Sequence, residues 1–284
     1  MKILVTGSGG MLAKQIIQHF KREKINIIGL KKEELNITNT IQLKEKIEQH
    51  KPDLIINCAA YTKVDMAELE KDRAFILNAL APYHLAEICK KNNIFLIQIS
   101  TDYVFSGEKN EPYHPFDTPN PVNYYGITKL YGEHYIINSG CNYLIVRTSW
   151  LYGPEGNNFL TKILRATEEK EELQVVNDQF GAPTSTATLA KYLLKLIEKN
   201  AHGIFHITDR AGNGISWYTF AKKIVEVFER KLKIVPISTE DSIKRPARRP
   251  PYSTLDISAT EYFLSEKLPY WEISLGDLRN YMKI

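Results

Sequence analysis

The chain has 284 residues, of which 43% are hydrophobic and 25% are charged, and its formal net charge at pH 7 is +4. This composition excludes extended disorder and is typical of a globular protein with one large core or two smaller ones. The 37 basic and 33 acidic residues are mixed along the chain, so no basic stripe indicates nucleic-acid binding.

Three widely spaced cysteines, Cys58, Cys89 and Cys141, form neither a CxxC pair nor an even disulfide framework. They indicate buried thiols in a reducing compartment. The N-terminal segment lacks the long apolar region of a signal peptide, and no apolar run approaches the length needed to cross a bilayer. We therefore expect a cytoplasmic protein that contacts no membrane.

A short apolar strand at 2–5 runs directly into a glycine-rich turn, after which apolar residues recur at helical spacing. The turn carries Gly7, Gly10 and Ala13 at three-residue intervals. A helix that starts just beyond such a turn directs free N–H groups and its positive dipole end at a pyrophosphate. The pattern predicts a dinucleotide-binding turn, and a tight βα turn without a ligand is the simpler alternative.

A second strand at 25–30 is followed by Lys31 and Lys32, where a site selective for NAD often carries an acidic residue for the ribose hydroxyls. The missing acid and the two lysines favour NADPH, whose additional phosphate they could bind. NADH remains the alternative cofactor, because two exposed lysines on a loop are common.

Further strands and helices alternate along the first 150 residues. A helix at 40–49 precedes a strand at 54–60 that ends in small residues, Ala59 and Ala60, and another strand at 94–99 follows a helix that contains Asn78. Such alternation predicts an α/β fold with a Rossmann-type doubly wound parallel sheet. Ligands of these sheets bind at the carboxyl ends of the strands.

Thr101 lies at one such strand end, and Tyr125 and Lys129 are four residues apart in a predicted helix. The helix is expected to begin near Asn120-Pro121, since Asn is a good N-cap and Pro is tolerated in the first turn. A lysine beside a tyrosine favours the phenolate, so we expect a lowered tyrosine pKa. Thr101 would then contact the carbonyl oxygen that Tyr125 protonates.

The second half contains predicted helices at 158–169, 186–199 and 217–230 and predicted strands at 173–176 and 203–207. We expect residues 1–152 and about 182–208 to form the dinucleotide-binding domain. Residues about 153–181 and 209–284 would form a smaller, C-terminal substrate-binding lobe. The basic run 244–249 suits phosphate oxygens, although a solvated surface is the alternative. No metal-ligand spacing is present, and we predict no catalytic metal.

These motifs resemble the short-chain dehydrogenase/reductase superfamily, in the extended branch that acts on nucleotide sugars. Within that branch the chain resembles the dTDP-4-dehydrorhamnose reductase family almost throughout. The segments that carry this resemblance are 59–65, 100–105, 147–153, 156–159, 178–184 and 246–250.

The resemblance implies roles for individual residues. Tyr125 would donate a proton, Lys129 would orient the nicotinamide ribose, and Thr101 would polarise the sugar carbonyl. The cofactor-binding residues implied are Gly7, Gly10, Met11, Leu12, Lys31, Asn36, Ile37, Ala59, Ala60, Tyr61, Thr62, Asn78, Tyr125 and Lys129. The substrate-binding residues implied are Thr101, Asp102, Tyr103, Trp150, Asn158, Arg248 and Arg249.

The activity implied is NAD(P)H-dependent reduction of the C4 keto group of dTDP-4-dehydro-L-rhamnose to dTDP-L-rhamnose, the final step of dTDP-rhamnose biosynthesis. Separately, we expect a monomer or homodimer, between which the sequence does not decide. The alternatives are another nucleotide-sugar enzyme, such as a 4-epimerase or 4,6-dehydratase, and a non-catalytic NADP-binding protein like the regulatory subunit of methionine adenosyltransferase. Dehydratases of this branch carry Thr-Asp-Glu where this chain has Thr101-Asp102-Tyr103. The missing second acid argues against dehydration.

Overall fold

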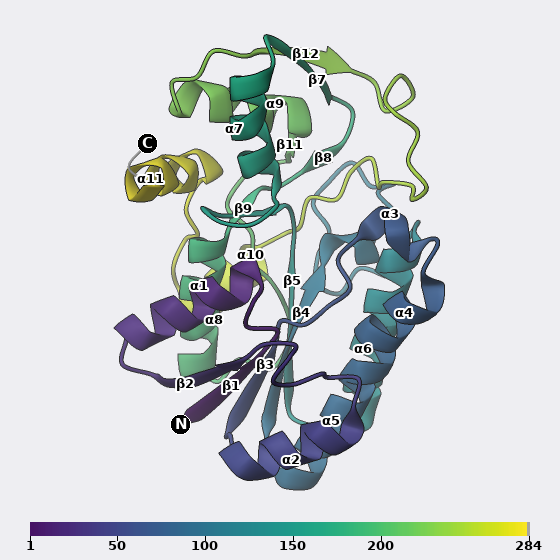
Figure 1. Ribbon diagram of the computed structural model, residues 1–284, viewed down its shortest axis with the longest axis vertical. Coiled ribbons are helices and arrows are strands. Elements are labelled where there is room, and N and C mark those ends of the chain that lie inside the picture. The colour runs from purple at the N-terminus through teal and green to yellow at the C-terminus, as the bar shows by residue number, and fades with distance from the viewer. Residues whose placement is uncertain (283–284) are drawn as a thin grey trace.

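Six parallel strands form the central sheet in the spatial order β2-β1-β3-β4-β5-β10 (Figure 1). The strands are β1 (Lys2–Thr6), β2 (Asn26–Leu30), β3 (Leu54–Asn57), β4 (Phe95–Thr101), β5 (Tyr143–Thr148) and β10 (Gly203–His206). This computed structural model describes residues 1–282; residues 283–284, which the predicted lobe includes, lie outside the described part. The predicted doubly wound parallel sheet is confirmed.

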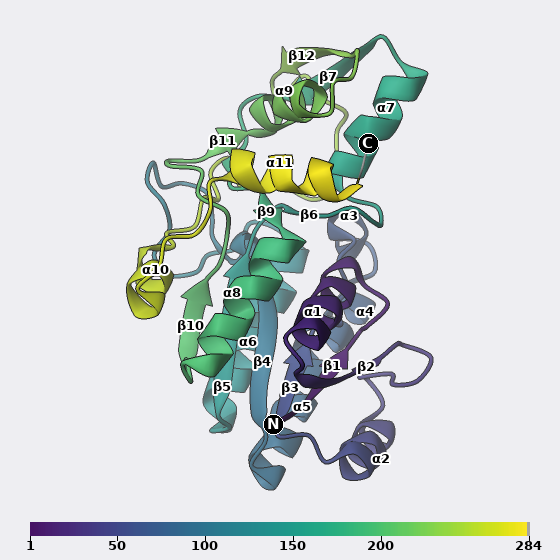
Figure 2. The same ribbon diagram turned by 90° about the vertical axis from the view of Figure 1, so that its left-hand side faces the viewer.

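Helices cover both faces of the sheet (Figures 1 and 2). One face packs against α1 (Met11–Arg22) and α8 (Thr186–Glu198), and the other packs against α2 (Thr40–His50), α5 (Ala81–Asn92) and α6 (Tyr124–Ser139). Neighbouring residues of β1 divide between the two cores: Ile3 and Val5 pack on the α1 and α8 side, and Leu4 packs on the opposite side. Side chains alternate along a strand, so a strand buried on both faces is apolar throughout.

The strand order reverses between β1 and β3, and this is the point where ligands bind in such sheets. After β3 come two short helices and a single-turn π-helix, namely α3 (Val64–Ala67), α4 (Lys71–Phe75) and η1 (Ile76–Leu80). The helix predicted around Asn78 is therefore π-helical at that residue. Isolated π turns of this kind occur frequently at functional sites.

The smaller lobe lies beyond the carboxyl ends of the strands (Figures 1 and 2). Its main elements are α7 (Phe159–Glu169), α9 (Trp217–Val227), α11 (Trp271–Met282) and the parallel pair β7 (Glu172–Val176) and β12 (Lys233–Ile237). Tyr152, Phe220, Trp271 and Leu275 lie in its separate core. The exact division of the chain into two domains stays a prediction.

Short elements connect the lobe to the sheet. They are η2 (Asp102–Val104), β6 (Leu151–Tyr152), β8 (Phe180–Gly181), β9 (Thr184–Ser185), β11 (Ile215–Ser216) and α10 (Ser258–Leu264). β6 pairs with β9, and β8 pairs with β11. The chain therefore crosses between the lobe and the sheet several times, which fixes the lobe above the strand ends.

The close approach of α6 to η1 depends on Gly132. A Cβ atom at this position would lie 2.3 Å from the carbonyl oxygen of Asn78, so we expect Gly132→Ala to lower the free energy of unfolding by about 1–3 kcal/mol through overpacking. Gly276→Ala is the matched control in α11, because its Cβ would meet nothing within 4 Å. The control should gain up to about 1 kcal/mol from helix propensity. Urea unfolding measures both, and equal stabilities would contradict the steric argument.

Candidate active site

The glycine turn after β1 forms a cradle at the point where the strand order reverses. Gly7 has a φ of +64°, and a Cβ atom there would lie 2.8 Å from the Cα atom of Ala59, which follows β3. Gly10 is the N-cap of α1 and no side chain caps this helix. The N–H groups of the first turn, which includes Met11 and Leu12, are available to an anion. The turn therefore fits the pyrophosphate of a dinucleotide.

The helix α6 begins three residues later than predicted. Its N-cap is Asn123, whose side-chain oxygen accepts a hydrogen bond from the Gly126 N–H at 2.8 Å. The expected start at Asn120-Pro121 is wrong, because the cap forms where a side chain reaches the unpaired N–H groups of the first turn. Tyr125 therefore lies in the first turn of α6.

Tyr125 and Thr101 meet at the carboxyl end of β4. The Thr101 side chain interacts with the Tyr125 hydroxyl, while burial raises the pKa of Tyr125 to about 12. The expected lowering of this pKa by Lys129 is wrong: the Lys129 ammonium donates to the Ile99 carbonyl oxygen at 2.7 Å, and burial lowers its own pKa to about 8. Tyr125 is therefore protonated near neutral pH, as a proton donor must be.

A buried chain of hydrogen bonds, which the sequence analysis missed, links the neighbouring strands β1, β3 and β4 to Lys129. The Thr6 hydroxyl donates to Asn57 at 2.6 Å, and the Asn57 amide donates to Gln98 at 2.7 Å. The Gln98 amide donates to the Ile99 carbonyl at 2.8 Å, the same oxygen that accepts from Lys129. The signal in the sequence is the amide side chains of Asn57 and Gln98, each next to a run of apolar strand residues.

Asn78 fixes the loop that follows β3. Its side chain accepts from the Tyr61 N–H at 2.8 Å and donates to both the Tyr61 carbonyl and the Thr128 hydroxyl at 3.1 Å. The predicted nicotinamide contacts Ala59, Ala60 and Thr62 belong to this loop. The geometry therefore indicates that Asn78 holds the loop after β3 against α6.

The predicted adenine-side residues lie just beyond β2. Lys31 is exposed, whereas the Asn36 side chain accepts from the Thr38 N–H and hydroxyl at 3.2 and 2.9 Å. Ile37 is 2% exposed and packs in the core beside α2. Of these residues, Lys31 has the side chain best placed to meet a phosphate in solvent.

Two predicted substrate-binding residues follow Thr101 directly. Asp102 is buried, accepts a hydrogen bond from Thr101 at 3.0 Å, and has a pKa raised to about 7 by burial. The Tyr103 ring makes an edge contact with Tyr125, with ring centroids 5.9 Å apart. Both residues are thus close to the proposed proton donor.

Trp150 lies between the sheet and the lobe in a strained conformation, with φ +45°. Its ring stacks on Trp217 at a centroid distance of 3.5 Å. A Cβ atom at Gly181 would come within 2.6 Å of the same indole. The lobe therefore holds this ring in one orientation, which pre-organises a flat apolar surface.

Asn158 caps α7 rather than pointing freely into a substrate site. Its side-chain oxygen accepts from the Thr161 N–H at 3.2 Å and its amide donates to the Gly153 carbonyl at 3.0 Å and to the Met11 sulfur at 3.3 Å. Its substrate contact stays a prediction, since these bonds already occupy its amide.

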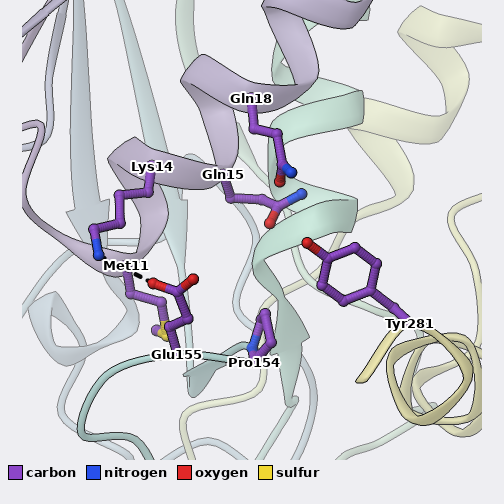
Figure 3. A pocket seen from close by; sticks show the side chains of 7 residues that line it. All are labelled: Met11, Lys14, Gln15, Gln18, Pro154, Glu155 and Tyr281. Carbon is purple, nitrogen blue, oxygen red and sulfur yellow. Dashed lines mark hydrogen bonds and ion pairs between the residues drawn. The ribbon is translucent and has the colours of Figure 1, made fainter. Parts of the chain in front are cut away.

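A cavity of about 300 Å³ lies between α1, the loop after β6 and α11 (Figure 3). Lys14 and Glu155 form an ion pair of 3.0 Å at its edge, and Met11 lines it beside the glycine turn. Tyr281 and two glutamines of α1 complete the lining. Segment 153–158 thus covers the start of α1 through the ion pair and the Asn158 contact.

Arg249 joins the C-terminal segment to α3. Its two terminal nitrogens each contact one carboxylate oxygen of Asp65 at 2.9 Å, and it also donates to the Ala247 carbonyl at 2.7 Å. Arg248 is exposed, and its carbonyl accepts from Asn123 at 2.9 Å. Arg249 therefore attaches the basic segment to Asp65 of α3. The Arg248 side chain is exposed to solvent.

Within residues 1–282, no three His, Cys, Asp or Glu side chains group as a metal site would require. None of the helices in that range has the length and apolar character to cross a bilayer.

Comparison with known proteins relates the whole chain to one group. Residues 1–283 match the family model described as the RmlD substrate binding domain. The chain is 34% identical over 293 residues to the dTDP-4-dehydrorhamnose reductase of Aggregatibacter actinomycetemcomitans, covering 99% of each chain. It is similar to the solved dTDP-4-dehydrorhamnose reductase of Bacillus anthracis in complex with NADP, with a TM-score of 0.94, 38% identity, and coverage of 99% and 100%. The Clostridium acetobutylicum structure gives a TM-score of 0.95 at 38% identity, with both chains fully covered.

The Asp65–Arg249 pair should contribute to stability in a pH-dependent way. Although burial acts in the opposite direction, hydrogen bonds and charge from Arg249 lower the Asp65 pKa below its ordinary 3.8. This contribution is complete above pH 3.8 and is lost as the pH falls through the folded-state pKa. In a double-mutant cycle at pH 7, Asp65→Asn and Arg249→Met should couple by about 0.5–3 kcal/mol. Additive losses in urea unfolding would contradict this coupling.

Proposed function

Because this chain belongs to the dTDP-4-dehydrorhamnose reductase family, we propose that it uses NADPH to reduce the C4 keto group of dTDP-4-dehydro-L-rhamnose. The product is dTDP-L-rhamnose, so this reduction is the last step of dTDP-rhamnose biosynthesis. The enzyme is an oxidoreductase, and NADH is its alternative cofactor. The observation that carries the proposal is the meeting of the Thr101 and Tyr125 side chains at the carboxyl end of β4.

The roles of the site residues follow from their geometry. When bound, NADPH supplies the hydride that adds to C4 of the sugar. Tyr125, protonated because burial raises its pKa to about 12, donates its proton to the forming alkoxide, which is a much stronger base than a phenolate. Thr101 directs the Tyr125 hydroxyl, and Lys129, whose pKa of about 8 keeps it charged near neutral pH, orients the nicotinamide ribose. Water can then return a proton to Tyr125.

The cofactor contacts proposed at Gly7, Gly10, Met11 and Leu12 are supported by the glycine cradle and the uncapped start of α1. Trp150 offers its flat ring to the sugar nucleotide, and Asp102 offers a carboxyl group to the sugar hydroxyls. The comparisons lend no support to the epimerase, dehydratase or regulatory alternatives. Cytoplasmic location and a monomeric or homodimeric state remain our predictions.

Tyr125→Phe tests the central assignment. It removes one hydroxyl and keeps the ring, so turnover should fall by about 10² to 10⁴, the usual contribution of a positioned general acid. The dissociation constant for NADPH should change little. Absorbance at the reduced-nicotinamide band, with dTDP-4-dehydro-L-rhamnose supplied, measures the turnover. Tyr124→Phe is the matched control on the same helix and should keep near-native turnover. If Tyr125→Phe also does so, the proton has another source.

Replacing Lys31 and Lys32 by Ala tests cofactor choice. Both side chains are exposed just after β2, where an additional ribose phosphate would meet them. The double variant should bind NADPH more weakly and bind NADH as before, as measured by fluorescence titration. Lys44→Ala, an exposed lysine of α2, should leave both affinities unchanged. An equal loss for the two cofactors would show that the lysines do not recognise the phosphate.

A further inference from the structure

Three consecutive residues at the end of β4 contact three residues on one face of α6. The Ile99 carbonyl oxygen accepts a hydrogen bond from the Lys129 ammonium, and the Thr101 side chain interacts with the Tyr125 hydroxyl. Between them, the Ser100 hydroxyl donates a hydrogen bond to Glu133. The three α6 residues are spaced by four, so they follow one another along the same face of the helix. Glu133 is therefore the third contact of the row that holds the proposed catalytic pair.

Glu133 is in turn held by Arg147 of β5. The Arg147 Nε lies 3.0 and 3.2 Å from the two carboxylate oxygens, and a terminal nitrogen lies 2.6 Å from one of them. Glu133 is 1% exposed and Arg147 is 2% exposed. Arg147 also donates to the Pro115 carbonyl at 3.1 Å, and it pairs in register with Ser100 across the β4–β5 ladder. The carboxylate thus has a fixed position and a full set of partners.

We propose that Glu133, fixed by Arg147 and Ser100, is a positioning residue that keeps Lys129 charged and aligned with the end of β4. This inference rests on the proposed reduction, because it concerns the lysine that would hold the nicotinamide ribose in that reaction. The buried Glu133–Arg147 ion pair lies outside the Tyr-x-x-x-Lys motif, and through Lys129 it takes part in the chemistry of that motif.

Charge explains how Glu133 acts on Lys129. Burial lowers the Lys129 pKa to about 8, and Glu133 and then Cys58 oppose this shift. The titratable groups that act on Lys129 are Glu133 of α6 and Cys58 after β3, and Arg147 of β5 lies behind Glu133. Asp102 of η2 is the charged group that acts on Tyr125. Because burial raises the Cys58 pKa to about 12, that thiol is neutral near pH 8. Glu133 is thus the anion that sustains the lysine charge.

The test begins with Glu133→Gln, which keeps the shape and a hydrogen-bond acceptor but removes the charge. Loss of an opposite charge nearby should lower the Lys129 pKa by about one unit or more. The alkaline limb of the NADPH dissociation constant, measured by fluorescence without sugar, should move to lower pH by this amount. The alkaline limb of turnover should move with it. In a Lys129→Met background, Glu133→Gln should cause no further shift.

A double variant separates the effect on Lys129 from simple destabilisation. Glu133→Gln alone leaves Arg147 buried without its anion, so the urea midpoint should fall. Adding Arg147→Met removes the unpaired charge and should recover most of that loss, because buried ion pairs can often be replaced by apolar groups. The alkaline limb should stay shifted in the double variant. If recovery of the midpoint also returns the limb to its wild-type position, Glu133 has only a structural role and the proposal is overturned.

Glu261→Gln is the matched control in α10. Glu261 is also buried, and it pairs with Lys267 at 2.8 Å and with Arg210 at 3.6 Å, away from α6. It should lower the urea midpoint and leave the pH profile unchanged. An equal shift in this control, or no shift in Glu133→Gln, would overturn the proposal. A wild-type protein that binds NADPH but does not reduce the sugar would instead contradict the proposed function, and the binding profile would still test Glu133.

Discussion

The packing of α6 against the end of β4 is the constraint on which the rest of the site depends. One helix face and three consecutive strand residues fix the phenol, the ammonium and the buried carboxylate relative to one another. Removing one partner of the Glu133–Arg147 pair would leave an uncompensated charge in the interior, which costs about 3–5 kcal/mol. The geometry of the site and the stability of the central fold are therefore coupled through the same contacts.

The electrostatics of this site differ from those of an isolated tyrosine and lysine. Burial acts in opposite directions on the two groups: it raises the pKa of a phenol, whose charged form is an anion, and lowers that of an ammonium. With a pKa of about 12 the phenol keeps its proton near neutral pH, and with a pKa of about 8 the ammonium keeps most of its charge.

Loop attachments explain how the lobe is held above the sheet. The Asp65–Arg249 pair ties the basic C-terminal segment to α3, and the Lys14–Glu155 pair ties the loop after β6 to α1. Trp150 lies between the sheet and the lobe, and its ring stacks on Trp217 of the lobe. The residues that would recognise a sugar nucleotide are consequently positioned by contacts between segments far apart in the sequence.

Much of this arrangement could be predicted from local patterns. Alternating apolar strands and helices indicated the parallel sheet, and the glycine turn, Thr101, Tyr125 and Lys129 indicated a site at the strand ends, because periodicity and turn chemistry are properties of short segments. The same patterns gave the wrong first residue of α6 and the wrong direction for the Tyr125 pKa. They also could not show that Arg249 pairs with Asp65, that Asn158 caps α7, or that Glu133 meets Arg147. Those pairings join distant residues, and burial, which determines the pKa values, exists only once the tertiary structure has excluded water from the site.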